Sequence, residues 1–192
     1  MGAIYRYLEH HVSSGTDGLF VEIGSDNGEG STRYLDSLAQ KYNTRLISVD
    51  VTDQARQQLG SQLAATDFVI DTGSNWADDF ALAGGQISLL YLDNFDYIYD
   101  LMHIDDRIQS QIAHYRTRGV DMCNQACQIE HLKQLLLLMP CFSKDAVVAL
   151  DDTYLWNDCW VGKSGPGVVY LLAEGWQVIE RTLDCGVILK KV

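Results

Sequence analysis

The 192-residue chain lacks any apolar run that approaches the roughly 20 residues needed to span a bilayer. Proline occurs only twice, and the composition does not match a collagen-like, low-complexity or disordered chain. Residues 1–11 mix charged and apolar side chains and lack the apolar core of a signal peptide. We therefore expect a cytoplasmic globular protein with no membrane partner, and the length predicts a single domain over residues 1–192.

Basic residues are also scarce, because 14 Lys and Arg stand against 26 Asp and Glu, for a net charge of −12. Nucleic-acid binding depends on cationic contacts to phosphates, so this balance predicts no nucleic-acid partner. A cation, or a neutral or cationic small molecule, is a suitable ligand for such a chain. The five cysteines are odd in number and not tightly clustered, which indicates free thiols in a reducing compartment.

Short apolar runs alternate with helical patterns along the chain. Strands are expected at residues 18–24, 45–50, 66–71, 87–93, 146–150, 176–182 and 185–191. Helices are expected at residues 31–42, 53–63, 75–82, 129–139 and 166–174. This order predicts an α/β fold with a mostly parallel seven-stranded sheet. The last two strands are joined tightly through residues 183–184, without a helix, and should form an antiparallel hairpin.

Residues 95–126 do not follow this alternation. The segment is polar, carries several tyrosines and is longer than an ordinary crossover turn. We expect it to form a lid-like insertion that shapes a substrate pocket.

Four of the expected strands end in acidic residues or run directly into them. These residues are Asp50, Asp71, Asp93 and the pair Asp151 and Asp152. Ligands of open α/β sheets bind beyond the carboxyl ends of the strands. These carboxylates should therefore meet at one edge of the sheet and form part of a site.

A glycine-rich turn at residues 24–30 follows the first strand. Its spacing, G-x-x-x-G-x-G, differs from the dinucleotide pattern G-x-G-x-x-G. Glu22 and Asp26 make the turn acidic, so it would repel a pyrophosphate and accept a ligand that carries an ammonium group. Asp50, at the end of the next strand, is placed to accept hydrogen bonds from a ribose diol.

The run Phe20-Val-Glu-Ile-Gly-Ser-Asp-Asn-Gly-Glu-Gly-Ser-Thr32, followed by Ser48-Val-Asp50, resembles the first two motifs of class I S-adenosylmethionine-dependent methyltransferases. The resemblance implies a Rossmann-like fold and S-adenosylmethionine as cofactor. It implies that the following residues contact this cofactor: Glu22, Gly24, Ser25, Gly28, Gly30, Ser31, Asp50, Val51, Asp71, Thr72, Gly73 and Asp93.

A narrower resemblance concerns Leu90-Tyr-Leu-Asp93-Asn-Phe and Val148-Ala-Leu-Asp151-Asp152-Thr. Both runs are similar to segments of cation-dependent small-molecule O-methyltransferases. The resemblance implies that Asp93, Asp151 and Asp152 bind a divalent cation, Mg²⁺ or Mn²⁺, which are cations that favour oxygen ligands.

The chain departs from those enzymes at their usual catalytic lysine, because Asn94-Phe-Asp96 follows Asp93. His131 and Lys163 are substitute candidates, and Asp93 is the third expected catalytic residue. The arrangement of Asp93, Gln128, His131 and Asp151-Asp152 also resembles a group of uncharacterised methyltransferase-like proteins.

These resemblances imply a metal-assisted transfer of a methyl group to a hydroxyl of a small molecule, with His131 as a candidate proton acceptor. Two alternatives stay open. One is an enzyme of the same fold that uses the cofactor or a metal for cyclisation or hydroxylation, and the other is a non-catalytic cofactor-binding module. A homodimer through the insertion or the terminal hairpin is a further hypothesis.

Overall fold

The computed structural model describes residues 3–12, 17–28, 30–99, 104–117, 119–182 and 186–191. Its strands are β1 (Leu19–Ile23), β2 (Leu46–Asp50), β3 (Thr66–Ile70), β4 (Ile87–Leu92), β5 (Phe142–Asp151), β6 (Thr153–Trp156), β7 (Cys159–Gly162), β8 (Gln177–Arg181) and β9 (Gly186–Lys190). Its helices are η1 (Ile4–His10), α1 (Ser31–Lys41), α2 (Gln54–Leu59), α3 (Gly73–Leu82), α4 (Asp106–Thr117), α5 (Asn124–Leu138), η2 (Met139–Cys141) and α6 (Gly165–Ala173).

A seven-stranded sheet in the order β3-β2-β1-β4-β5-β9-β8 forms the centre of the molecule. The strands β1 to β5 pair in parallel, and β9 is antiparallel to both β5 and β8. The predicted α/β fold with an antiparallel terminal pair is therefore confirmed. The tight turn expected at residues 183–184 lies outside the described residues.

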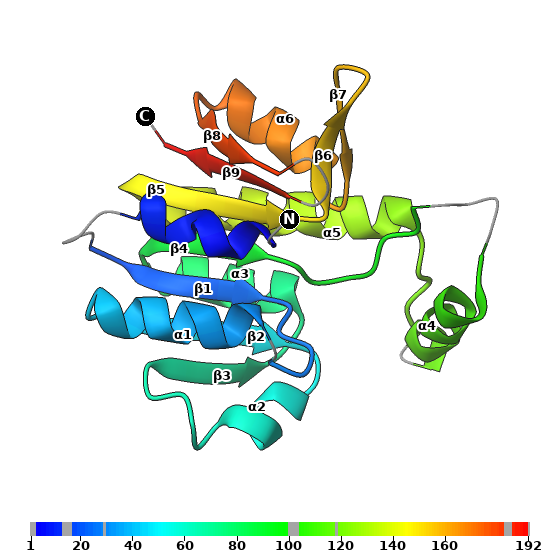
Figure 1. Ribbon diagram of the computed structural model, residues 1–192, viewed down its shortest axis with the longest axis horizontal. Helices are drawn as coiled ribbons and strands as arrows, with labels where there is room; N and C mark the ends of the chain where they lie inside the picture. Colours follow the sequence, from blue (N-terminus) through cyan, green and yellow to red (C-terminus); the bar gives the residue numbers. More distant parts are fainter. Residues whose placement is uncertain are drawn as a thin grey trace.

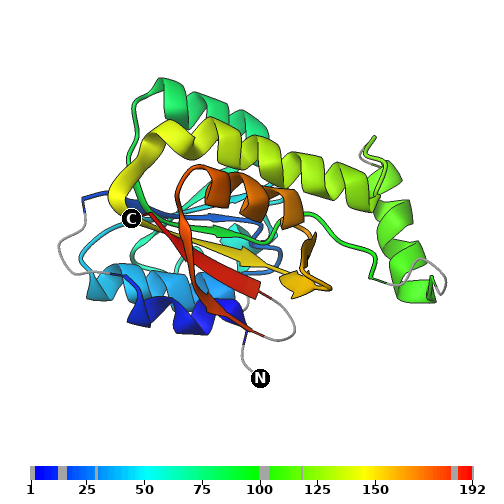
Figure 2. The same cartoon turned by 90° about the horizontal axis from the view of Figure 1, so that it is seen from above.

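Helices cover both faces of the sheet, with α3, α5 and α6 on one face and η1 and α1 on the other (Figure 2). All six residues of β4 are buried. Leu90 and Leu92 pack into the cluster under α3, α5 and α6, whereas Leu89 and Tyr91 pack into the cluster under η1 and α1. Because side chains alternate between the faces of a strand, a strand covered on both sides is apolar throughout. The continuous apolar run of β4 is explained by this double burial.

A second hairpin, β6–β7, was not expected from the sequence. Its strands pair antiparallel from Thr153 with Gly162 to Trp156 with Cys159. The two residues between them, Asn157 and Asp158, have φ values of 46° and 61°. Such a two-residue turn needs positive φ at both positions, which Asn and Asp tolerate better than most residues. The hairpin turns the chain back toward the end of β5.

The expected insertion at residues 95–126 contains α4 and the first residues of α5. Helix α5 begins at Asn124, earlier than predicted, where the Cys123 thiol accepts a hydrogen bond from the Ala126 amide at 3.4 Å. Helix α4 has no buried residue and extends away from the sheet (Figure 1). No helix in the described ranges combines the length and apolarity that a membrane span requires.

Candidate functional site

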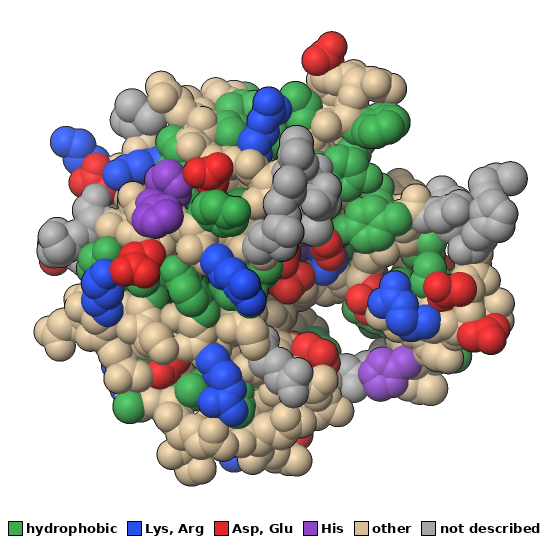
Figure 3. All heavy atoms as spheres, in the orientation of Figure 1, with side chains coloured by type: hydrophobic (Ala, Val, Ile, Leu, Met, Phe, Trp, Pro, Cys, Tyr) green, Lys and Arg blue, Asp and Glu red, His purple; other side chains and the backbone are tan. Residues whose placement is uncertain are grey.

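A cavity of about 940 Å³ lies beyond the carboxyl ends of β1, β2, β3 and β4, and residues of α4 close its far side. Figure 3 shows the molecule hollowed between its main body and α4, with acidic side chains near the edge. Most of the residues that the sequence assigned to the cofactor line this cavity, namely Gly24, Ser25, Ser31, Asp50, Val51, Asp71, Thr72, Gly73 and Asp93. Glu22, Gly28 and Gly30 lie outside its lining.

The turn after β1 passes directly against the end of β4. A Cβ atom on Gly24 would lie 2.4 Å from the Asn94 amide nitrogen, and the φ of Gly24 is +97°. Residues with a side chain rarely adopt this φ, and an overlap with backbone atoms at 2.4 Å cannot be relieved without moving the chain. Only glycine therefore lets the turn approach β4 closely enough to form one wall of the cavity.

The Asp50 carboxylate holds this turn in place. Its Oδ2 accepts hydrogen bonds from the amides of Ser25 and Asp26, both at 3.0 Å. Its Oδ1 accepts from the amide and the hydroxyl of Thr52 at 2.8 and 3.0 Å. A carboxylate has about four acceptor positions, so a ribose diol would have to share or replace some of these donors.

Two buried polar atoms at the cavity have no hydrogen-bond partner among the described residues. They are the Ser25 hydroxyl and the side-chain carbonyl oxygen of Asn94. Buried polar atoms without partners are uncommon in folded proteins, and they indicate a ligand that supplies the missing partners. The residues present therefore fit a polar cofactor with hydroxyl or ammonium donors. Asn94 was not assigned to the cofactor, although it directly follows Asp93.

Glu22 lies under the turn and is fully buried. Its Oε2 accepts hydrogen bonds from the hydroxyls of Thr32 and Ser48, both at 2.8 Å, while Oε1 has no partner among the described residues. Burial raises the pKa of the Glu22 carboxyl to about 7, and the hydroxyl contacts oppose this only in part. Ionisation of Glu22 therefore costs stability.

We expect Glu22→Gln to make the stability of the fold less sensitive to pH. The folded-state pKa of Glu22 lies above its ordinary value of 4.5, so its stabilising contribution is complete below about pH 4.5 and is lost as pH rises through 7. At pH 8 the variant should gain on the order of 3 kcal/mol in free energy of unfolding relative to wild type, and the gain should shrink at pH 5. Urea denaturation at both pH values measures this. Glu174→Gln, at an exposed position, is the control and should change neither value.

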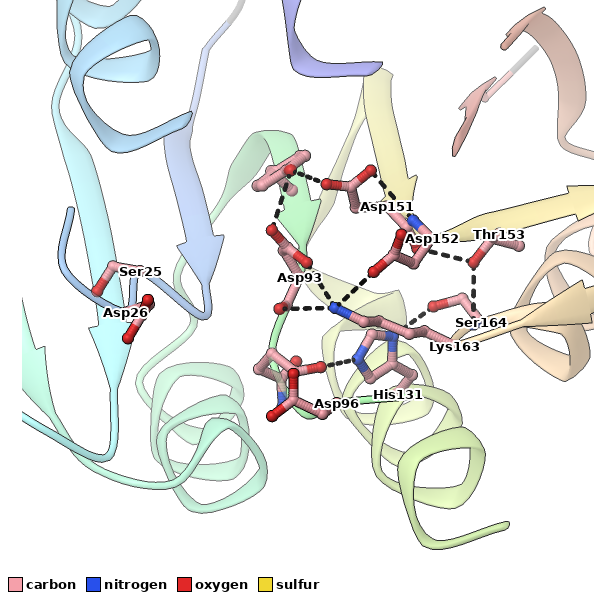
Figure 4. Close-up of polar contacts among 12 residues, drawn as sticks. Ser25, Asp26, Asp93, Asp96, His131, Asp151, Asp152, Thr153, Lys163 and Ser164 are labelled. Carbon is pink, nitrogen blue, oxygen red and sulfur yellow. Dashed lines mark hydrogen bonds and ion pairs between the residues drawn. The ribbon is translucent and has the colours of Figure 1, made fainter. Parts of the chain in front are cut away.

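The Lys163 ammonium lies among the carboxylates that were predicted to bind a metal (Figure 4). Its Nζ is 2.7 Å from Asp93 Oδ1 and 3.1 Å from Asp152 Oδ2. The Lys163 side chain is only 6% exposed, compared with 28% for Asp93 and 33% for Asp152. Burial alone would lower the pKa of Lys163, but the two carboxylates outweigh it and raise the pKa above the ordinary value. Lys163 is therefore charged at neutral pH.

The Tyr91 hydroxyl holds the other side of this cluster. It contacts Asp151 Oδ2 at 2.5 Å and Asp93 Oδ2 at 3.3 Å. Burial raises the pKa of Asp151 to about 7, with the Asp93 charge acting in the same direction. Burial also raises the pKa of Asp93, against the opposing effect of Lys163. The three carboxylates are thus partnered by one ammonium and one phenol.

This donor set does not fit a divalent cation as it is arranged. The position between Asp93 and Asp152 is taken by Lys163 Nζ, and Asp151 is bonded to Tyr91. Among the described residues, no three His, Cys, Asp or Glu side chains are grouped so that they could hold a metal ion. The metal centre that the resemblance implied is therefore not supported by this arrangement, in which a lysine distant in sequence supplies the positive charge.

His131 is fully buried on α5, and both of its ring nitrogens have partners. Its Nε2 is 2.6 Å from the Asn94 main-chain oxygen, so Nε2 carries the proton, and Nδ1 accepts from the Ser164 hydroxyl. Burial lowers the pKa of His131 to about 4. The neutral ring joins the segment after β4 to the start of α6, and it is not part of the cavity lining.

Neither a protein-family model nor a curated protein matches the chain. Solved structures resemble it over nearly its whole length. A protein of Clostridium thermocellum assigned as an rRNA methylase has a TM-score of 0.55 at 15% identity, over 98% of this chain and 95% of that one. The 1,6-didemethyltoxoflavin-N1-methyltransferase of Burkholderia thailandensis, solved with S-adenosylhomocysteine, has a TM-score of 0.53 at 12% identity, over 98% and 76%. A TDP-rhamnose 3′-O-methyltransferase of calicheamicin biosynthesis has a TM-score of 0.54 at 14% identity, over 97% and 76%.

These similarities show that the chain has the Rossmann-like fold of class I S-adenosylmethionine-dependent methyltransferases, as the sequence motifs implied. The proteins compared include enzymes named for different acceptors. The acceptor must therefore be argued from the residues of the cavity itself.

Proposed function

We propose that the chain transfers a methyl group from S-adenosylmethionine to a hydroxyl oxygen of a small molecule. The observation that supports this most directly is that one cavity is lined both by the glycine turn and by the Asp93–Lys163 pair. A volume of about 940 Å³ leaves room for a nucleoside cofactor and an acceptor side by side.

At the cofactor end, the unpartnered atoms of Ser25 and Asn94 would receive donor groups of the cofactor, and Asp50 would share its carboxylate with the ribose hydroxyls. Asp71 and Thr72 line the same end, where the resemblance puts the adenine. When bound, the cofactor would supply a methyl group on a positive sulfur, and that sulfur would keep the electron pair of the C–S bond when the methyl group passes to the oxygen of the substrate. The acidic lining suits a cofactor that carries sulfonium and ammonium charges.

At the acceptor end, Phe95 and Tyr115 form an aromatic wall with their ring centroids 4.9 Å apart. The Asp96 amide donates a hydrogen bond to the Tyr115 hydroxyl at 3.0 Å, which joins α4 to the segment after β4. Asp93 lines the cavity beside this wall, and its raised pKa makes it a stronger base than an ordinary carboxylate. We assign Asp93 as the base that takes the proton of the acceptor hydroxyl, and we assign His131 a positioning role.

The charge of the cavity narrows the class of acceptor. Its lining carboxylates are Asp26, Asp50, Asp71, Asp93, Asp96 and Glu130, and its lining lysines are Lys133 and Lys163. A polyphosphate or nucleic-acid backbone would be repelled from such a lining. An uncharged or cationic hydroxylated molecule with an apolar or aromatic part fits the wall and the charge best. We expect it to be methylated in the cytoplasm, where the free thiols stay reduced.

Asp50→Ala is expected to weaken binding of S-adenosylhomocysteine roughly 100-fold. The substitution removes a charged acceptor from the ribose and releases the amides of Ser25 and Asp26, each a charge-assisted bond. Isothermal titration of S-adenosylhomocysteine measures the affinity. The control is Asp53→Ala, at an exposed acid outside the cavity lining, which should bind as wild type does. A wild-type chain that binds neither this ligand nor S-adenosylmethionine would contradict the proposal.

The product separates methyl transfer from the alternatives. Incubation with S-adenosylmethionine and a panel of hydroxylated acceptors should yield S-adenosylhomocysteine together with an acceptor heavier by one methylene unit. Methylthioadenosine formed without an acceptor would indicate cyclisation of the cofactor instead. Cofactor binding without any product across the panel would favour a binding module.

A further inference from the structure

Lys163 is held beside the carboxylates by contacts of its own backbone and of the preceding Gly162. The Lys163 amide donates to the Asp152 main-chain oxygen at 3.0 Å, and Gln128 Nε2 donates to the Gly162 oxygen at 3.0 Å. A Cβ on Gly162 would lie 2.0 Å from the Asp152 oxygen, and its φ is +93°. The β6–β7 hairpin therefore returns the chain to the end of β5 so closely that only glycine fits before Lys163.

Asp152 is also held in an uncommon conformation. Its φ is +49°, a left-handed value that few non-glycine residues adopt. This backbone conformation accompanies the ion pair between its Oδ2 and Lys163 Nζ. A strained residue that is held against a buried charge indicates that the surrounding fold fixes this ion pair in place.

The Lys163 ammonium has three N–H groups, and three acceptors surround it. These are Asp93 Oδ1 at 2.7 Å, Asp152 Oδ2 at 3.1 Å and the Asp93 main-chain oxygen at 3.3 Å (Figure 4). The last contact is the longest, and Lys163 itself lines the cavity. The hydroxyl oxygen of a substrate in the cavity can replace this longest hydrogen bond at little cost in free energy, since the two carboxylate contacts keep the ammonium in place.

We propose that the Lys163 ammonium is the resident cation of this site, at the place where the sequence resemblance implied a divalent metal ion. It would donate a hydrogen bond to the acceptor oxygen and favour its ionised form, so that Lys163 is a catalytic residue and the reaction needs no metal ion. This role rests on the proposed methyl transfer. Whether the ammonium takes the place of a metal ion can nevertheless be tested by metal binding, without a measurement of methyl transfer.

Manganese is the probe, because free Mn²⁺ loses its electron paramagnetic resonance signal when a protein binds it. Wild type should not bind Mn²⁺ below about 1 mM, because the ammonium fills the cation position. Lys163→Ala should bind Mn²⁺ below that concentration, because Asp93, Asp151 and Asp152 are left without the ammonium. Lys133→Ala loses the same charge from an exposed lysine of the same cavity and should bind no better than wild type. Adding Asp152→Asn to Lys163→Ala should abolish the gained site.

Two results would overturn the inference. One is wild-type binding of Mn²⁺ below about 1 mM, which needs no variant to be detected. The other is a Lys163→Ala protein with an unchanged circular dichroism spectrum that binds Mn²⁺ no better than Lys133→Ala.

Calorimetry with S-adenosylhomocysteine keeps this inference separate from the proposed function. Wild-type binding in EDTA supports the proposed cofactor site, and the Mn²⁺ titration then decides the role of Lys163. Binding that disappears in EDTA and returns with Mn²⁺ contradicts the role of Lys163. Binding that is absent in both conditions contradicts the proposed function, while the Mn²⁺ titration still decides whether the ammonium replaces the metal.

Discussion

Gly24→Ala is expected to abolish measurable binding of S-adenosylhomocysteine and to lower the free energy of unfolding by about 2–4 kcal/mol. The added Cβ would lie 2.4 Å from the Asn94 amide nitrogen and 2.7 Å from the Asp93 carbonyl carbon, at a φ of +97°. Both contacts are with backbone, so neither can be relieved by a change of rotamer. The turn would have to move away from β4, and the cavity wall that carries Ser25 and Asn94 would be displaced.

A second glycine offers a matched control. Gly84 has a φ of +72°, but a Cβ there would meet nothing within 4 Å. Gly84→Ala should cost only the left-handed backbone strain, about 1–2 kcal/mol, and should leave the affinity for S-adenosylhomocysteine unchanged. Calorimetry and urea denaturation together measure both effects. If Gly24→Ala bound the ligand within about tenfold of wild type, the turn could not be the cofactor wall.

Lys163→Met should lower the free energy of unfolding at pH 8 by about 3–5 kcal/mol, the usual cost of removing one partner from a buried ion pair. The methionine side chain keeps most of the apolar stem of lysine, so the loss reports mainly on charge. Asp93 and Asp152 would be left side by side without their cation. The loss should shrink toward pH 5, because carboxyls without the ammonium take up protons more readily there.

A double variant separates lost charge from lost packing. Asp152→Asn combined with Lys163→Met should recover part of the stability, because one uncompensated carboxylate is removed. Lys133→Met, at an exposed lysine of the same cavity, should change the free energy of unfolding by less than about 0.5 kcal/mol. A Lys163→Met protein as stable as wild type at pH 8 would show that the ion pair contributes little to the fold.

Both predictions concern contacts at the ends of β1, β4 and β5. In the sheet these three strands are adjacent, with β4 between β1 and β5. The glycine turn, the Asp93–Asn94 segment and the Asp152–Lys163 pair therefore lie in a row along one edge of the sheet. The proposed methyl transfer needs the donor and acceptor groups in close alignment, and the position of β4 between the two halves puts Asp93 beside both.

The sequence by itself determined the order of the seven strands of the main sheet and of α1, α2, α3, α5 and α6, the edge of the sheet where the acidic side chains lie and the glycine turn after β1. Each depends on local chemistry, such as apolar runs for doubly covered strands and glycine where the backbone turns against a neighbour. The β6–β7 hairpin was missed although Asn157-Asp158 is a recognisable turn signal, because its strands are short and half exposed.

Only the tertiary structure decided which groups pair with the acidic side chains. Asp93 and Lys163 are 70 residues apart, and nothing local to either predicts their ion pair. The sequence likewise offered His131 as a proton acceptor, whereas the packing of α5 against the segment after β4 and the start of α6 occupies both ring nitrogens. The end of a strand places a carboxylate at the edge of the sheet, but the return path of a distant hairpin decides whether a metal ion or an ammonium meets it there.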